Sequence, residues 1–259
     1  MTQLISTTPT AESTQWVGGV EFVSSTPHEA SDHIVALASE STGKGTHVHL
    51  ANAYTVALAD KQASYSEVLA APAVNFPDGK PIGWISALRG QSPRLAQVRG
   101  PKLFLDVFDK GREQGIRHFV LGSTDDVLDS LTRRLHAKFP GIDIVGVESP
   151  PFRVLDSDEL RAQDDRIRSS GADIVWVGLG TPKQDHEAQR LAGNLPVVAV
   201  AIGAAIDFAA GTTPEAPAWM TKAGLEWAYR FASEPRRLWK RYVFGNARFL
   251  KAALVAPAR

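Results

Sequence analysis

The sequence has no cysteine among its 259 residues. This absence excludes disulfide scaffolds, catalytic thiolates and zinc sites built on cysteine, and it is compatible with a reducing compartment. Long hydrophobic runs are missing too: the longest, residues 197–206, has ten residues and ends at Asp207. A membrane-spanning helix needs about 20 such residues, so we expect a chain that does not cross a bilayer.

Several well-known sequence fingerprints are also absent. Neither the G-x-G-x-x-G dinucleotide pattern nor a P-loop occurs, and no G-x-S-x-G turn marks a serine hydrolase. The seven histidines show no zinc spacing, because His47 and His49 alternate along one predicted strand and His186 has no partner four residues away. We therefore expect no metal site built on histidine.

What is present is a regular alternation of strand-like and helix-like segments. Thr26 is the expected N-cap of the first helix, with Pro27 at its first position and Glu29 completing a capping box. The expected strands are residues 17–24, 46–52, 73–76, 116–122, 142–147, 172–180 and 196–203, and the expected helices are 26–41, 53–62, 81–90, 103–115, 124–139, 156–171 and 182–193. This order predicts an α/β fold with a Rossmann-like, doubly wound, mostly parallel sheet.

The charges are unevenly distributed, although the formal net charge is zero. Residues 217–259 contain nine Lys or Arg against two Glu, and eight of the chain's 21 aromatic residues. Such a segment favours a nucleic acid or an anionic membrane surface as its neighbour. We therefore predict a flexible tail (1–16), an α/β domain (17–216) and a basic, amphipathic helical appendage (217–259).

The stretch "VGLGTPKQD", residues 177–185, ends one predicted strand and opens the next helix. Ligands of doubly wound sheets bind beyond the carboxyl ends of the strands. Gly178 and Gly180 would let the backbone approach a ligand, while Thr181 is the expected cap of a helix whose free amides face an anion. Lys183 and Gln184 lie in its first turn. The alternative is a tight turn with solvated polar residues.

Other strand ends carry similar features. Gly122 would allow close approach of a ligand, and Ser123 or Thr124 is the expected cap of the following helix, although plain capping explains this stretch equally. Asn52 ends another strand, and Gly203 and Asp207 follow the last one. We predict that these strand ends form one ligand site.

Asp78 lies in "FPDGKPIGW" at a further strand end. A partly buried carboxylate there could act as a general base, because burial raises its pKa toward neutrality. Pro-Asp-Gly is equally an ordinary turn sequence, in which Asp bonds its own backbone. The acidic pair Asp156 and Asp158 could hold a divalent ion, but it also suits a helix start, which is the interpretation we favour.

The appendage contains a clearly divided amphipathic segment at residues 236–243. A helical projection separates the basic residues Arg237, Lys240 and Arg241 from an apolar half that includes Trp239. This pattern is typical of a helix in a membrane interface, and it also fits a helix packed on its own domain. The separation of basic from aromatic residues argues against a nucleic-acid groove, and we expect no nucleic-acid partner.

Four stretches together are specific to a known family. "NFPDG", "GADIVWVGLGTPKQD", "AIGAAIDFAAGTTPEAPAW" and "GLEWAYRFASEPRRLWKRYVFGNARFL" resemble the WecG/TagA/CpsF bacterial glycosyltransferases over roughly residues 20–250. The resemblance implies an inverting transfer of an N-acetylmannosamine-type sugar from a UDP donor to a polyprenyl-diphosphate-linked acceptor. It also implies a peripheral position on the cytoplasmic face of the membrane, no cofactor or bound metal, and surface polysaccharide synthesis. A homo-oligomer is compatible with it.

The resemblance implies roles for particular residues. Asp78 takes the position of the proposed general base and Gln184 that of the glutamine that helps bind the nucleotide. By position, Arg230, Arg237 and Lys240 or Arg241 would reach over the active site from a membrane-docking tail, with Trp239 beside them. Asn52, Gly122, Ser123, Gly178, Gly180, Thr181, Lys183, Gly203 and Asp207 complete the expected donor site.

The chain departs from the family pattern at "QVRGPKLF". Gln97 stands where the family has an arginine thought to assist the diphosphate, and Lys102 stands where it has an aspartate. Arg99 or Arg94 could substitute. Leu50 replaces the hydroxyl residue two positions before Asn52. Alternatives are therefore a catalytically weakened homologue that binds nucleotide-sugar or lipid diphosphate, and a soluble nucleotide-dependent enzyme with no lipid acceptor.

Overall fold

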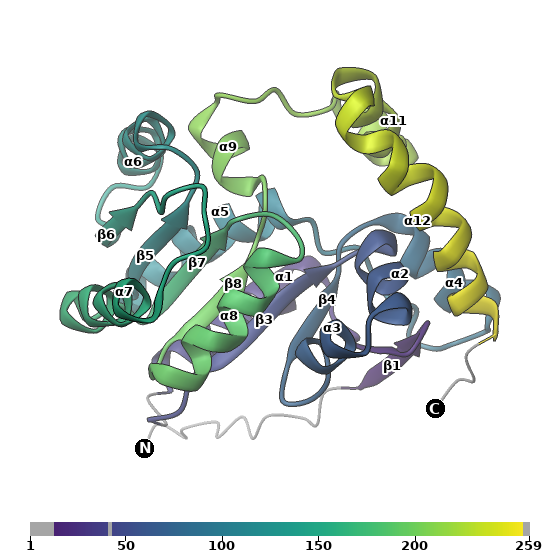
Figure 1. The fold of residues 1–259 in the computed structure, drawn as a ribbon. Helices are drawn as coiled ribbons and strands as arrows, with labels where there is room; N and C mark the ends of the chain where they lie inside the picture. Colours follow the sequence, from purple (N-terminus) through teal and green to yellow (C-terminus); the bar gives the residue numbers. More distant parts are fainter. Residues whose placement is uncertain (1–12, 41–42, 256–259) are drawn as a thin grey trace, which may run out of the picture.

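A computed structural model describes residues 13–40 and 43–255, apart from the side chains of residues 218, 222, 237 and 240–244. Its centre is a six-stranded sheet with the order β4-β3-β8-β7-β5-β6, in which every neighbouring pair is parallel. The predicted Rossmann-like, doubly wound fold is confirmed (Figure 1). The strands are β1 (Thr14–Val17), β2 (Val20–Val23), β3 (Thr46–Ala51), β4 (Val74–Pro77), β5 (Arg117–Gly122), β6 (Asp143–Glu148), β7 (Ile174–Gly178) and β8 (Val198–Ala201).

Helices cover both faces of this sheet (Figure 1). Those described are α1 (Pro27–Ser39), α2 (Ala53–Lys61), α3 (Ala63–Val68), α4 (Lys80–Leu88), α5 (Gly100–Gly111), α6 (Asp125–Lys138), α7 (Ser157–Ser170), α8 (Lys183–Asn194), α9 (Ala205–Ala210), α10 (Ala218–Ala223), α11 (Glu226–Ser233) and α12 (Pro235–Val255), with a 3-10 turn at Arg112–Gln114. The capping box of α1 is confirmed, since Thr26 Oγ1 accepts from the Glu29 amide and Glu29 Oε2 accepts from the Thr26 amide.

The period-two pattern of β7 shows how the two faces are filled. Ile174 and Trp176 point into a core shared with α1, α5 and α6, whereas Val175 and Val177 point into a second core with α7 and α8. Successive strand side chains alternate between faces, so an uninterrupted apolar run is what a centrally placed strand requires. The carboxyl ends of β3, β4, β5, β7 and β8 consequently lie along one edge of the sheet.

The N-terminal region differs from the prediction of a single strand at residues 17–24. Gly18 and Gly19 both have positive φ, +60° and +82°, and they turn the chain between β1 and β2, which pair as an antiparallel hairpin. Two successive residues with positive φ form the turn that best fits a two-residue hairpin, and glycine adopts this geometry readily. β1 begins at Thr14, within the residues expected to be a flexible tail. Residues 1–12 are not described.

The C-terminal appendage is anchored at its far end. Phe249, Ala252 and Ala253 of α12 are buried in a third core with β1, β2 and α2, and Arg248 ion-pairs with Asp60 at 2.6 Å. Figure 1 shows α12 running from α11 down the side of α2. The second half of α12 therefore packs into the hydrophobic core of the domain.

Candidate active site

A cavity of about 720 Å³ opens at the carboxyl edge of the sheet, with walls from five strand ends, the loop between β6 and α7, and α11. This volume suits a ligand of nucleotide size. The cavity brings together these residues predicted from sequence: Asn52, Asp78, Ser123, Gly178, Gly180, Thr181, Lys183, Gln184, Gly203, Asp207 and Arg230. Gly122, Arg94, Arg99 and Gln97 are not among its lining residues.

Asp78 is held by the strand end that precedes it. Its amide donates to the Ala51 carbonyl of the neighbouring strand at 2.9 Å, and its carboxyl accepts a hydrogen bond from the Gly100 amide. Burial, followed by the negative charge of Glu226, raises the pKa of Asp78 to about 6, while Arg230 and Arg99 oppose this change. A carboxylate with this pKa can accept a proton near neutral pH, as a general base must.

The turn before α8 is built differently from the prediction. Pro182 occupies the N-cap position, and no side chain caps the helix, so the expected capping by Thr181 is wrong. Instead Gln184 reaches back, and its Oε1 accepts from the Gly180 amide at 3.0 Å. Gly180 has φ +76° and open space where a Cβ would stand, which agrees with a backbone that a ligand can approach.

Two of the predicted site glycines are closely packed against neighbouring residues. A Cβ on Gly122 would lie 2.5 Å from the carbonyl oxygen of Gly178, and one on Gly178 would lie 2.3 Å from Ile206 Cδ1. Gly122 therefore lets β5 lie against β7, and its predicted role in the close approach of a ligand stays a prediction. Gly178 lines the cavity and also admits α9.

Ser123 and Asp207 form a polar pair in the cavity wall. Thr124 occupies the N-cap position of α6 without a side-chain hydrogen bond, so the expected capping by Ser123 or Thr124 is wrong. Ser123 has a positive φ of 61°, and its hydroxyl donates to Asp207 Oδ1 at 3.0 Å. The strained backbone of Ser123 directs its side chain across the strand ends to α9.

Asp156 and Asp158, the acidic pair considered for a divalent ion, serve as a helix start. Asp156 caps α7 by accepting from the amides of Asp158 and Glu159, both at 2.9 Å, and Glu159 completes the capping box. Among the residues that the structure describes, no group of three or more acidic or histidine side chains could hold a metal ion.

The loop between β6 and α7 forms a wall that sequence reasoning missed. Phe152 and Val154 line the cavity although 89% and 90% of their surfaces are exposed, and Arg153 between them pairs with Glu159. The two consecutive prolines at residues 150–151 were the available indication of an ordered loop. Apolar side chains so exposed beside a cavity are candidates for contact with a ligand.

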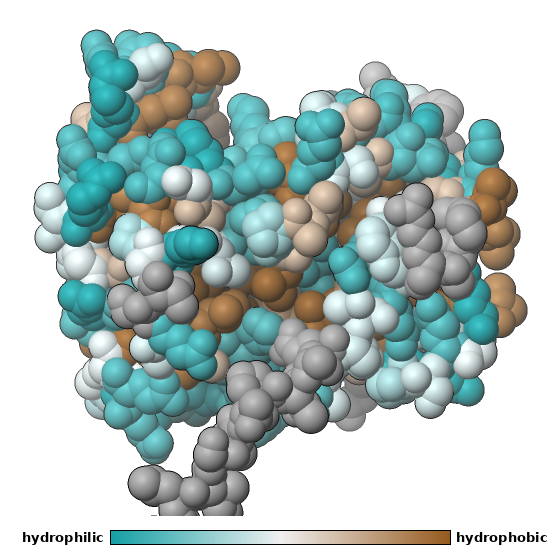
Figure 2. All heavy atoms as spheres, turned by 90° about the horizontal axis from the view of Figure 1, so that it is seen from below, coloured by the Kyte–Doolittle hydropathy of each residue, from teal (hydrophilic) through white to brown (hydrophobic). Residues whose placement is uncertain are grey.

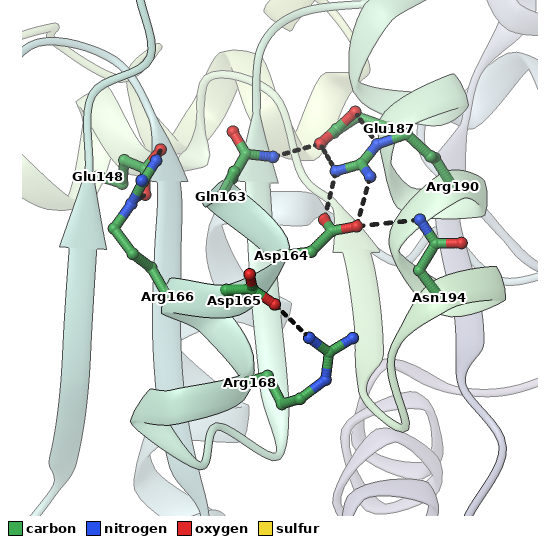
Figure 3. A network of polar contacts seen from close by, with 9 residues as sticks. All are labelled: Glu148, Gln163, Asp164, Asp165, Arg166, Arg168, Glu187, Arg190 and Asn194. Atoms are coloured by element: carbon green, nitrogen blue, oxygen red, sulfur yellow. Dashed lines mark hydrogen bonds and ion pairs between the residues drawn. The ribbon is translucent and has the colours of Figure 1, made fainter. Parts of the chain in front are cut away.

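A polar network joins α7 to α8 beneath this loop (Figure 3). Arg190 forms two hydrogen bonds with Asp164, at 2.7 and 2.8 Å, and also pairs with Glu187. Glu187 in turn accepts from Gln163 at 2.6 Å, and both of these residues line the cavity. The network therefore fixes the spacing of the two helices that flank the cavity.

A second network, buried on the opposite side of α8, was also missed. His47 Nδ1 lies 2.9 Å from His49 Nε2, and His49 Nδ1 lies 3.0 Å from Asp185 Oδ1. Tyr65 donates its hydroxyl proton to Asp185 Oδ2 at 2.8 Å. Asp185 follows Gln184 directly, so this network ties the first turn of α8 to β3 and α3. Two histidines with period two on a strand were the indication available in the sequence.

Among the appendage side chains that the structure describes, Arg230 supplies a cation to the cavity. Arg230 of α11 lines it, with the guanidinium carbon 5.7 Å from the ring centre of Phe208. Trp239 is partly exposed on α12, outside the cavity lining. The predicted residues Arg237, Lys240 and Arg241 have side chains outside the described part of the structure.

Arg99, the predicted substitute for the missing family arginine, is bound to two carboxylates, Glu226 and Glu215. Lys102, at the position of the family aspartate, pairs with Asp106 along α5.

None of the described helices combines the length and the hydrophobicity that crossing a bilayer requires.

Comparisons with known proteins show which proteins this chain is similar to. A family model described as the glycosyl transferase WecG/TagA/CpsF family matches residues 15–259. A Bacillus spizizenii protein is 30% identical over 199 residues, covering 76% of this chain and 75% of the relative. A Bacillus subtilis protein is 29% identical over 183 residues, covering 70% and 68%. Both relatives are named N-acetylglucosaminyldiphosphoundecaprenol N-acetyl-beta-D-mannosaminyltransferase.

Proposed function

Because the chain belongs to the WecG/TagA/CpsF glycosyl transferase family and is a hexosyltransferase of cell-surface polysaccharide biosynthesis, we propose that it moves an N-acetylmannosamine-type sugar from UDP to a polyprenyl-diphosphate-linked acceptor. The observation that carries this proposal is that Asp78 and Gln184, from different strand ends, line one cavity together with Arg230. A proton acceptor and groups suited to a nucleotide diphosphate thus face the same space.

In the proposed reaction, Asp78 accepts the proton of the acceptor hydroxyl as its oxygen attacks the anomeric carbon. The bond from that carbon to the diphosphate oxygen breaks, and its electron pair leaves with UDP, which inverts the configuration. Lys183 and Arg230 would stabilise the developing negative charge, together with the free amides at the start of α8. No step of this scheme requires a bound metal.

We propose that the base of the nucleotide stacks on Phe152. Stacking of a base on an aromatic side chain contributes about 1–3 kcal/mol, so Phe152→Ala should raise the Kd for UDP about tenfold. Isothermal titration calorimetry would measure this, with Phe152→Trp as the matched variant that keeps a ring and binds with near wild-type affinity. Equal affinity of wild type and Phe152→Ala would contradict the stacking role.

We propose that the protein binds peripherally to the cytoplasmic face of the membrane, where a lipid-linked acceptor lies. Exposed tryptophans occur on α10, α11 and α12, and Trp219 is 65% exposed. Trp84 of α4, 56% exposed, continues this surface, since a Cβ on Gly224 would lie 3.3 Å from its ring. Together with the basic appendage, these residues suit an anionic lipid interface.

The opposite side of the molecule is less suited to lipid contact. Figure 2 views it from below, away from α9 and α11, and hydrophilic residues cover most of this face. Hydrophobic residues are visible there in several places, among them the edge on the side of α12, on the right in both views.

Substitution of exposed tryptophans tests this membrane surface. The double change Trp84→Ser and Trp219→Ser should weaken cosedimentation with phosphatidylglycerol-containing vesicles about tenfold or more, because each ring loses burial in the interface. Val147→Ser, on the exposed edge strand β6, is the control that should leave binding unchanged. Point changes are preferable to deletion after Pro217, which would also remove the buried residues of α12. Vesicle binding unaffected by the double change would refute this surface.

One observation favours the alternative function, that of a weakened homologue that binds nucleotide-sugar or lipid diphosphate but does not catalyse sugar transfer. Gln97 is uncharged, and Arg99 is bound to two carboxylates and does not line the cavity, so neither residue supplies a free cation to a diphosphate. UDP release measured with a panel of UDP-sugars and a short-chain lipid acceptor separates the two functions. Binding of UDP without turnover of any donor would favour the accessory role.

A further inference from the structure

Arg99 forms an ion-pair cluster that joins the domain to the appendage. Its Nε donates to Glu226 Oε2 at 3.1 Å and its Nη2 donates to Glu226 Oε1 at 3.2 Å, so the pair with α11 is bidentate. Nη2 also donates to Glu215 Oε2 at 3.1 Å. Arg99 and Glu226 are 21% and 24% exposed, so solvent screens this pair only in part.

The cluster lies beside the proposed catalytic base. The Val98 amide donates to the Pro77 carbonyl at 2.8 Å, and the Gly100 amide donates to the Asp78 carboxyl. Arg99 stands between these two contacts in the chain. Glu226 thus holds, through Arg99, the same three-residue segment that positions Asp78.

Glu226 also acts on Asp78 through its charge. Among the described residues, the charged groups that act on the Asp78 carboxyl include Glu226 and Arg230 from α11 and Arg99 from the start of α5. Glu226 raises the pKa of Asp78, whereas the two arginines lower it. Without Glu226, Asp78 would face two cations and no anion among these groups, and its carboxylate would be a weaker base.

We propose that Glu226 is a positioning residue for the transfer reaction: it docks α11 on Arg99 and, through Arg99, holds the segment that positions Asp78 to accept the proton of the acceptor hydroxyl. This inference rests on the proposed function, since it concerns the same base. Under this proposal, Asp78 can act as the base only when the appendage is docked on the domain. The reason is that α11 supplies both Glu226 and Arg230. Arg99, considered from sequence as a substitute for the missing family arginine, then has a structural role in this chain.

The test is the pH dependence of turnover for Glu226→Gln. Removing the charge of Glu226 should move the acidic limb of the kcat–pH profile to lower pH by about half a pH unit or more. The value of kcat at neutral pH should also fall, because a weaker base accepts the proton less well. The Kd for UDP should stay near the wild-type value. Glu226→Asp, which keeps the carboxylate, should restore part of kcat.

Glu215→Gln is the matched variant, since it also removes an ion pair from Arg99 but does not act on the charge of Asp78. In Glu215→Gln, the acidic limb of the kcat–pH profile should stay at the wild-type pH. Equal shifts in both variants would mean that Glu226 only anchors Arg99, and an unshifted limb in Glu226→Gln would overturn the proposal.

Carbon-13 NMR of labelled aspartate measures the pKa of Asp78 without turnover, with Asp78→Asn to assign its resonance. Glu226→Gln should lower that pKa even if no donor turns over. Absence of turnover in wild type would therefore count against the proposed function alone, and an unchanged pKa would count against the role of Glu226.

Discussion

Asp78→Asn should lower kcat for UDP-sugar transfer by a factor of about 10²–10⁴, the usual contribution of a positioned general base. Asparagine keeps the shape of the side chain and can still accept the Gly100 hydrogen bond, but it cannot take up the acceptor proton. UDP binding should persist, because the groups proposed to hold the diphosphate, Gln184, Lys183 and Arg230, are untouched. Stopped assays of UDP release and calorimetric titration with UDP measure the two quantities separately.

The pH profile gives a second readout of the same group. Burial and Glu226 raise the pKa of Asp78 to about 6, so the fraction of ionised base, and with it kcat/KM, should fall about tenfold per pH unit below that value. Asp126→Asn, an exposed aspartate in the first turn of α6, is the matched control and should leave rate and profile unchanged. Full activity of Asp78→Asn would exclude Asp78 as the base.

Asp185→Ala should destabilise the fold by about 3 kcal/mol, the cost of breaking a buried, hydrogen-bonded charged group away from its partners. Asp185 is only 3% exposed, and its two carboxylate oxygens bind His49 and Tyr65. The alanine would leave both partners unsatisfied in the interior. Urea unfolding followed by circular dichroism measures the change as a lower midpoint at constant slope.

A surface aspartate provides the control for this experiment. Asp165→Ala, which removes an exposed pair with Arg168, should change stability by less than about 0.5 kcal/mol. Asp185→Asn should fall between the two, since its amide oxygen can still accept from Tyr65. Equal midpoints for Asp185→Ala and Asp165→Ala would show that the buried network contributes nothing to stability.

The same network should make the protein sensitive to acid. Burial, followed by the neighbouring His49, lowers the pKa of His47 to about 4, from an ordinary value near 6.5. Between these two pH values the unfolded chain binds more protons than the native state, so the free energy of unfolding should decrease as the pH falls from about 6.5 toward 4. Replacing His47 with a neutral residue should flatten this dependence.

The sequence by itself determined the sheet and most of the helices. A short apolar run such as residues 174–178 is typical of a strand whose two faces are both buried. The capping box at Thr26 and Glu29 marks the start of a helix through local hydrogen bonds. It also predicted most of the polar and glycine residues that line the cavity, because strand ends of a parallel sheet meet at one edge. The family resemblance then assigned expected roles to Asp78 and Gln184, which the cavity brings together.

Only the tertiary structure decided how those residues are held. Ser123 bonds Asp207 instead of capping a helix, Gln184 secures Gly180, and Asp185 turns away from the cavity into a histidine network. Ser123 and Asp185 have partners 84 and 136 residues away in the chain, whereas Gln184 bonds a residue only four positions before it. Sequence patterns predict periodicity and helix capping, because these features depend on residues that are close together in the chain. Contacts between distant segments depend on how the helices and strands pack, and that packing also joins Glu226 of the appendage to Arg99 beside Asp78.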